Sequence, residues 1–172
     1  MPVSTTVPGT NGVPGRAGPL QGAEARGVGE DSPLRATREA KRSWKEKLKE
    51  LPYRVLFQEA TELAGSSPLN HEKRSGTWIC AACHSPLFTT DMKYDSGTGW
   101  PSFFGTLPGV VDTKRDFKLV LPRTEYHCAR CGGHHGHVFN DGPRPTGKRF
   151  CNNGASLKFV PEGEPLPEVR DS

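Results

Sequence analysis

The pattern of apolar and polar positions divides the chain into a helical front and a strand-rich remainder. Between residues 48 and 56 apolar residues recur at roughly helical spacing, and residues 43–46 (S-W-K-E) have the form of a capping box. Pro52 interrupts this segment, and proline disfavours a continuous helix. The pattern therefore predicts two short helices that meet near Pro52.

From Thr77 onward the periodicity changes to short β-branched and aromatic runs that glycine and proline punctuate, which is typical of strands. Cys80 and Cys128 each close such a run, so two strand ends would carry these cysteines to a common metal. The second half is predicted to be mostly antiparallel strand, over residues 77–79, 117–121, 124–127, 138–139 and 157–160.

The two ends of the chain lack such patterns. Residues 1–38 are rich in glycine and proline and poor in large apolar side chains, so they cannot bury enough surface to offset the entropy lost on ordering. Residues 163–172 are rich in proline and acidic side chains. The 172-residue chain is therefore predicted to hold one globular domain, residues 39–162, between a disordered leader (1–38) and a disordered tail (163–172).

Charge and hydropathy narrow the class of protein. The net charge of +4 is modest, and many basic residues fall between positions 35 and 54, where they alternate with glutamates as on a solvated helix. No apolar run approaches the roughly 18 residues of a membrane span, and no secretory signal is recognisable. We expect a monomeric, cytoplasmic protein that binds neither membrane nor nucleic acid.

The five cysteines divide into four and one. Cys80 and Cys83 form one C-x-x-C pair, and a second pair is formed by Cys128 and Cys131. The two pairs can complete a tetrahedral shell around zinc and leave no ligand position open for substrate, so the metal would be structural. Iron in an all-thiolate site is the main alternative. Cys151 remains without a partner, and a reducing compartment would keep it as a thiol.

Three histidines, His134, His135 and His137, follow the second cysteine pair. If a strand begins between His135 and His137, these two point to one face, while the glycine turn places His134 separately. A histidine-rich surface turn is the alternative. Histidine or Arg149 near Cys151 would lower the pKa of the thiol and populate the nucleophilic thiolate. A lone cysteine is otherwise usually a small buried apolar residue.

Residues 95–104 form a glycine-hinged loop that carries Trp100. From spacing alone, this tryptophan is best interpreted as a hydrophobic plug of the core. The alternative is a binding surface, because aromatic rings pack well against thioethers and methyl groups.

Taken together, these residues resemble the B class of methionine sulfoxide reductases, which reduce the R epimer of methionine sulfoxide. The similarity runs from about residue 44 to residue 162. It rests on the combination of five motifs: C-x-x-C at Cys80, G-W-P-S-F at 99–103, C-x-x-C at Cys128, G-G-H-x-G-H-V-F at 132–139 and R-F-C-x-N at 149–153.

The resemblance implies a mainly β fold of one domain, with two antiparallel sheets, short N-terminal helices and a zinc staple opposite the active site. It implies that Cys151 attacks the sulfoxide and becomes a sulfenic acid, that His134 or His137 protonates the departing oxygen, and that Arg149 supports the thiolate. The enzyme would repair oxidised proteins or peptides, and the residues implied to bind the substrate are Trp100, Phe103 and Asn153.

Thr98 departs from the pattern of the family. Many relatives carry a resolving cysteine at this position, where it would form an internal disulfide with the oxidised nucleophile. This chain lacks that route. We therefore expect a one-cysteine cycle in which thioredoxin or a low-molecular-weight thiol regenerates Cys151.

Two other functions remain open at the level of sequence. One is a structural zinc-ribbon interaction module that binds nucleic acid, in line with a pI of about 8.9. It leaves Cys151, Trp100 and the histidines without a joint explanation. The other is an enzyme-derived scaffold without turnover, which the retained Cys151 disfavours.

Overall fold

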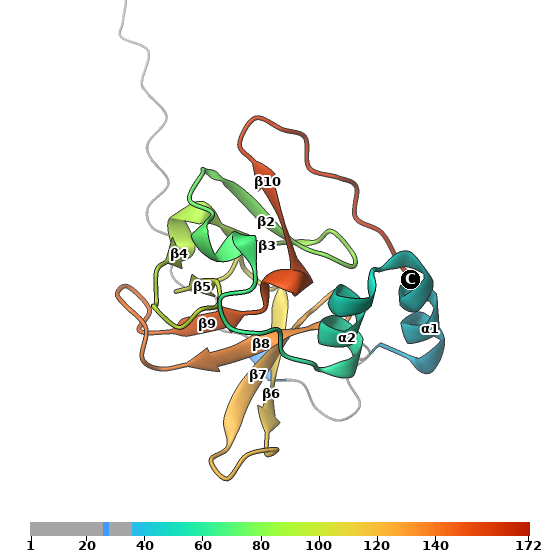
Figure 1. Cartoon of the computed structure of the whole chain (residues 1–172), viewed down its shortest axis with the longest axis horizontal. Helices are drawn as coiled ribbons and strands as arrows, with labels where there is room; N and C mark the ends of the chain where they lie inside the picture. The colour runs from blue at the N-terminus through green and yellow to red at the C-terminus, as the bar shows by residue number, and fades with distance from the viewer. Residues whose placement is uncertain (1–25, 28–35) are drawn as a thin grey trace, which may run out of the picture.

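The computed structural model describes residues 26–27 and 36–172, which form two sheets and two α-helices (Figure 1). The strand order is β1-β6-β7-β8-β9-β5-β4 in the large sheet and β10-β2-β3 in the small one. Every pairing is antiparallel except that of β1 with β6. The expected mainly β fold with short N-terminal helices is confirmed. The leader prediction for residues 1–38 falls almost entirely outside the described residues.

The elements have the following bounds. The helices are α1 (Arg38–Lys47) and α2 (Glu50–Gln58), and the short 3-10 helices are η1 (Pro68–His71), η2 (Thr90–Met92) and η3 (Gly154–Ser156). The small sheet comprises β2 (Gly76–Cys80), β3 (Pro86–Thr89) and β10 (Leu157–Pro161). The large sheet comprises β1 (Arg26–Gly27), β4 (Lys93–Tyr94), β5 (Ser102–Phe103), β6 (Val111–Asp116), β7 (Arg123–Cys128), β8 (His134–Phe139) and β9 (Arg149–Asn152).

The two helices form where the apolar spacing predicts them, but their boundaries differ from the prediction. The N-cap of α1 is Thr37, whose hydroxyl accepts the Ala40 N–H at 3.0 Å, and the capping-box serine lies inside the helix. The helices meet at residues 48–49, and Pro52 belongs to the first turn of α2. Proline is tolerated there because that N–H has no partner within the helix. Neither helix is long and apolar enough to cross a bilayer, and no other helix among the described residues is.

The core lies between the two sheets and is built largely from aromatic side chains. Tyr126, Phe150 and Phe103 project from one face of the large sheet, and they meet Phe88 and Trp78 of the small sheet. Phe88 stacks on Phe103 with ring centroids 4.0 Å apart. All five are at most 5% exposed. Successive residues of a strand point to opposite faces of the sheet. The neighbours of these core residues therefore point away from the core, and we call the face they form the polar face of the large sheet.

The hairpin between β6 and β7 extends away from the body of the molecule (Figure 1). Its register ends with Asp116 opposite Arg123, so the chain must turn within residues 117–122. The prediction of a strand over residues 117–121 is therefore wrong. The apolar side chains of this segment, which favoured the prediction of a strand, are exposed: Phe117 is 72% and Val120 is 100% exposed. Apolar composition alone does not distinguish a buried strand from an apolar turn.

The tail, for which composition favours disorder over residues 163–172, returns to the body of the protein beside α1 (Figure 1). Its Arg170 side chain donates to the Ala82 carbonyl at 2.6 Å, and the Arg170 N–H donates to the Cys83 carbonyl at 2.9 Å. The Asp171 carbonyl accepts a hydrogen bond from Lys47 at 2.9 Å. The tail therefore acts as a latch over the first C-x-x-C turn, although it contains no helix or strand.

Candidate active site and metal centre

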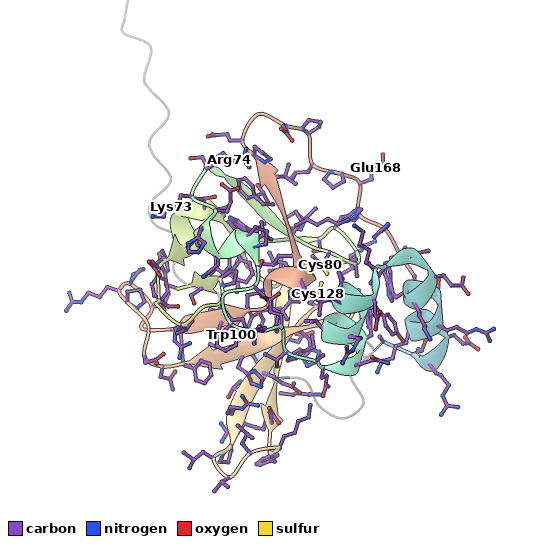
Figure 2. The ribbon with its side chains drawn as sticks, viewed as in Figure 1. Lys73, Arg74, Cys80, Trp100, Cys128 and Glu168 are labelled. Atoms are coloured by element: carbon purple, nitrogen blue, oxygen red, sulfur yellow. The ribbon has the colours of Figure 1, made fainter. Side chains whose placement is uncertain are left out.

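The four paired cysteines converge on one point between the two sheets. The sulfur atoms of Cys80 and Cys131 lie 3.7 Å apart, those of Cys83 and Cys128 lie 3.6 Å apart, and all four lie within 4.8 Å of one another. Figure 2 shows Cys80 and Cys128 side by side near α2. Four soft donors at this spacing, with no carboxylate among them, can hold a metal ion of the kind that favours thiolates.

Cys151 lies outside this cluster, on β9. It is paired in register with His137 of β8 on one side and with Ser102 of β5 on the other. Directly opposed residues of antiparallel strands place their side chains on the same face, with Cβ atoms about 4.5–5.5 Å apart. The thiol therefore belongs to the polar face of the large sheet. Trp100, on the loop that precedes β5, lies apart from Cys80 and Cys128 in Figure 2.

Gly136 allows β8 and β9 to approach closely beside the thiol. A Cβ atom at this position would lie 1.9 Å from the Cys151 carbonyl oxygen, a distance at which atoms overlap. Any larger residue would have to push β8 away from β9. The register of His137 against Cys151 therefore depends on this glycine.

A β-bulge sets the directions of the three histidines. The register of β7 and β8 shifts between Tyr126 and His127, so His135 is the extra residue of β8. His134 and His137 consequently share the polar face, with ring centroids 5.6 Å apart, whereas His135 is fully buried and stacks on Tyr126 in the core. The expectation that His135 and His137 share a face is therefore wrong, because regular alternation does not hold across a bulge.

The two histidines on the polar face are held by different carboxylates. His134 is 2% exposed, its Nδ1 lies 3.2 Å from a carboxylate oxygen of Glu125, and burial lowers its pKa to about 3. His137 is the more accessible ring, with a side chain 14% exposed, and its Nε2 lies 2.8 Å from the Asp116 carboxylate. Burial also lowers the pKa of His137, whereas the bond to Asp116 opposes that shift.

The electrostatics of the Cys151 thiol differ from the sequence expectation. Burial raises the pKa of the thiol and outweighs the lowering that Arg149 and the Thr98 hydroxyl cause through charge and hydrogen bonding. Arg149 is at the same time held by Asp141 through two bonds of 2.9 and 3.1 Å, and this carboxylate raises the pKa of the thiol. Cys151 is therefore mainly protonated at neutral pH in the resting protein.

The reactivity of Cys151 should therefore increase with pH above neutrality. Replacing Arg149 with methionine removes the main lowering influence, so we expect the thiol pKa to rise further and alkylation at pH 7 to slow by up to about tenfold, the effect of a one-unit shift. The measurement is the rate of iodoacetamide labelling of Cys151 against pH, by mass spectrometry. Lys148→Met is the control, since Lys148 bonds Asn140 instead. A wild-type titration midpoint below pH 7 would contradict this account.

Trp100 is fixed by a short segment that follows α2. Its indole N–H donates to the Glu62 carbonyl at 3.1 Å, and Gly65 N–H donates to the Gly99 carbonyl at 2.7 Å. The Glu62 carboxylate in turn accepts the backbone N–H groups of Gly154 and of the next residue. The Trp100 ring, which is partly exposed, is therefore held in place by the chain rather than plugged into the core.

Asn153 supports the same segment. Its side-chain oxygen accepts the Glu62 N–H at 2.9 Å, its amide donates to the His135 carbonyl at 2.9 Å, and the residue is 4% exposed. The role implied for it, orientation of the sulfoxide, stays a prediction. In the structure, Asn153 connects β8 to the segment that holds Trp100.

Phe103 lies on the core face of the sheet, away from Cys151. It is fully buried, lies opposite Phe150 on the core face of the sheet and stacks on Phe88. Because strand residues alternate in direction, Ser102 and not Phe103 shares the face of Cys151, and the role in substrate binding implied for Phe103 stays a prediction. Asp116, Glu125 and Phe139 were also not identified from the sequence as residues of the polar face. Strand register brings them to this face, and no local pattern in the sequence indicates that register.

Comparison with known proteins identifies relatives over most of this domain. Residues 48–161 match the family model described as the SelR domain. The chain is 52% identical over 120 residues to a peptide methionine sulfoxide reductase MsrB of Leptospira interrogans, covering 69% of this chain and 92% of the relative. It is 45% identical over 131 residues to the MsrB of Methanosarcina barkeri, covering 76% and 92%. A chloroplastic peptide methionine sulfoxide reductase B1 of Arabidopsis thaliana is 45% identical over 117 residues, covering 67% and 58%.

Proposed function

The chain belongs to the SelR-domain family of peptide methionine sulfoxide reductases, and we propose that Cys151 is the thiol with which it reduces the R epimer of methionine sulfoxide. The observation that carries this assignment is the position of Cys151: it lies outside the cysteine cluster and directly opposite His137. A nucleophile next to a possible proton donor is what sulfoxide reduction requires. The alternative of a zinc-ribbon interaction module is not favoured, because the family is one of enzymes.

The reaction transfers the sulfoxide oxygen from one sulfur to another. The Cys151 thiolate, the sulfoxide and one proton give the Cys151 sulfenic acid and methionine, so that the substrate sulfur is reduced by two electrons and the cysteine sulfur is oxidised by two. We assign the proton to His137 rather than His134, because His137 lies opposite the thiol and is the less buried ring. Burial raises the pKa of Cys151 and Arg149 lowers it, so we propose that Arg149 stabilises the thiolate when it forms with substrate bound.

We propose that Trp100 receives the substrate methyl group while the sulfoxide oxygen faces His137. A methyl group packs favourably on an indole ring, and the oxygen needs a donor, so only one of the two epimers can satisfy both while presenting its sulfur to Cys151. The site would act on methionine sulfoxide within peptides and proteins; the relatives are named as peptide methionine sulfoxide reductases.

The four clustered cysteines fit zinc, because four sulfur atoms within 4.8 Å of one another supply the number and kind of donors that a structural zinc ion takes. Cys80 is the last residue of β2 in the small sheet and Cys128 the last of β7 in the large sheet, while Cys83 and Cys131 lie in the turns that follow them, so the ion would join the two sheets. When bound, zinc would supply structural cross-linking; the reductive chemistry stays with Cys151.

The proposed function is tested by reduction of dabsylated methionine sulfoxide with dithiothreitol as the electron donor. We expect the R epimer to be consumed and the S epimer to remain. Consumption of both epimers at equal rates, or of neither, would contradict the assignment. Thioredoxin and glutathione can then be compared as donors, since we propose one of these two kinds of thiol, in a reducing cytoplasm, as the natural reductant.

A one-cysteine cycle has its own test at Thr98. Thr98 lies close enough to Cys151 for its hydroxyl to lower the pKa of the thiol, so a cysteine at position 98 would stand within reach of the sulfenic acid. We expect oxidised wild type to form a dimedone adduct at Cys151, and Thr98→Cys to form an internal disulfide that prevents most of the labelling. Mass spectrometry after one equivalent of methionine sulfoxide distinguishes the two, with Thr98→Ser as the control. An internal disulfide in the wild type would refute the cycle.

A further inference from the structure

Asp116 is a buried carboxylate at the end of β6, and it holds the ring of His137. Its side chain is 2% exposed, and one oxygen lies 2.8 Å from His137 Nε2 and 2.9 Å from Arg123 Nη2. The other oxygen accepts the Lys118 N–H at 2.9 Å. These bonds hold the pKa of Asp116 well below its ordinary value, so the carboxylate is ionised throughout the neutral range.

The contact determines which nitrogen of His137 can act on substrate. An ionised carboxylate only accepts hydrogen bonds, so Nε2 must carry the hydrogen and donate it to Asp116. Nδ1 is then the ring atom that can gain a proton and pass it on. A carboxylate behind a histidine fixes the tautomer and orientation of the ring, and it stabilises the imidazolium form.

His134 provides a contrast on the same strand. Its Nδ1, and not its Nε2, faces a carboxylate, that of Glu125, and the ring is almost completely buried. Glu125 is already paired with Lys114 at 2.8 Å, which reduces the support it gives to a charged ring. Of the two histidines, only His137 combines a carboxylate partner with access from the face of Cys151.

We propose that Asp116 is a positioning residue of this enzyme, which keeps His137 oriented and favours its protonated form for donation to the departing sulfoxide oxygen. This inference rests on the proposed function. In the step concerned, the Cys151 thiolate, the sulfoxide and the His137 imidazolium give the sulfenic acid, the thioether and a neutral imidazole. His137 then takes up a proton from solvent. The bond from sulfur to oxygen in the substrate breaks, and the bond from Cys151 sulfur to oxygen forms.

The charged and titratable groups around His137 determine the sign of the expected pH effect. They are Asp116 on β6, Arg123 and Glu125 on β7, His134 on β8 and Cys151 on β9. Burial lowers the pKa of His137 most, Arg123 and His134 lower it further, and Asp116 raises it. Removing the Asp116 charge should therefore lower the pKa of His137, and removing the Arg123 charge should raise it.

The decisive experiment compares Asp116→Asn with Arg123→Gln in the zinc-loaded protein. For Asp116→Asn we expect the single-turnover rate of sulfenic acid formation to fall about 10- to 100-fold. The acid limb of the pH profile reports the lower of the two pKa values, that of His137, and should move to lower pH. Arg123→Gln should move the same limb to higher pH. Asp112→Asn, a buried carboxylate on the same strand that lies opposite His127 in register, is the matched control and should leave the limb in place.

A second measurement is independent of activity. The titration of the His137 ring, followed by NMR, should shift down in Asp116→Asn and up in Arg123→Gln. Equal losses of rate at every pH with an unmoved His137 titration would overturn the inference and leave Asp116 a purely structural residue. If Asp116→Asn does not fold, Arg123→Gln provides the test: the His137 titration and the acid limb should both move to higher pH, and an unmoved titration would overturn the inference. Failure of the wild type to reduce the sulfoxide would instead refute the proposed function.

Discussion

Replacing Cys151 with serine is expected to reduce the single-turnover reduction of methionine sulfoxide by about 10⁴-fold or more. A serine hydroxyl is almost fully protonated at neutral pH, and to accept the oxygen it would have to form an oxygen–oxygen bond in place of a sulfenic acid. No other described cysteine can substitute, because the remaining four converge on the metal centre.

The measurement is consumption of the R epimer under single-turnover conditions, with dithiothreitol added only after the first turnover has been recorded. The fold of the variant should be intact, since sulfur and oxygen differ little in size and Cys151 is only partly buried. Zinc content and the thermal midpoint therefore serve as controls. Activity retained in Cys151→Ser would transfer the chemistry to another residue and end the assignment.

Removing the zinc ion proposed for the cysteine cluster, or replacing Cys128 with serine, is expected to abolish cooperative folding. Structural zinc binds with an apparent free energy of about 10–16 kcal/mol, which is of the same order as the roughly 5–15 kcal/mol by which a typical domain is stable. Here the cluster joins the end of β2 to the end of β7, so its loss would separate the two sheets that enclose the aromatic core.

This expectation can be checked by titrating the protein with a chelator while following released zinc with a chromogenic dye and tertiary packing by near-ultraviolet circular dichroism. The two signals should change together. The variant Cys151→Ser provides the comparison, because it should keep one zinc per chain and the wild-type transition. A metal-free protein that melts with an unchanged midpoint would show that the sheets hold together without the ion.

The chemistry of this protein can be predicted from its sequence because the residues of each motif are close together along the chain. Two C-x-x-C pairs each fix their ligands within a single turn, and Cys151 is recognised as the remaining thiol by counting. Strand runs at residues 77–79 and 157–160 were also placed correctly, within β2 and β10. In each case the information lies within a few neighbouring positions.

The features that the sequence did not predict depend on contacts between distant segments. The bulge beside Tyr126, which turns His134 and His137 to one face, exists only because β7 and β8 pair. The partnership of Asp116 with His137 likewise follows from the order of three strands. The raised pKa of Cys151 reflects burial, which a list of neighbouring charges does not show.

The latch formed by the tail has a practical consequence for anyone who handles the protein. Residues 162–169 are exposed, whereas Arg170 behind them is anchored to the Ala82 and Cys83 carbonyls. A single cut by a contaminating protease in that stretch would release the anchor while leaving every strand intact. If the cysteine cluster holds zinc as proposed, samples that lose the ion during storage should be examined by intact mass before the loss is attributed to oxidation of the cysteines.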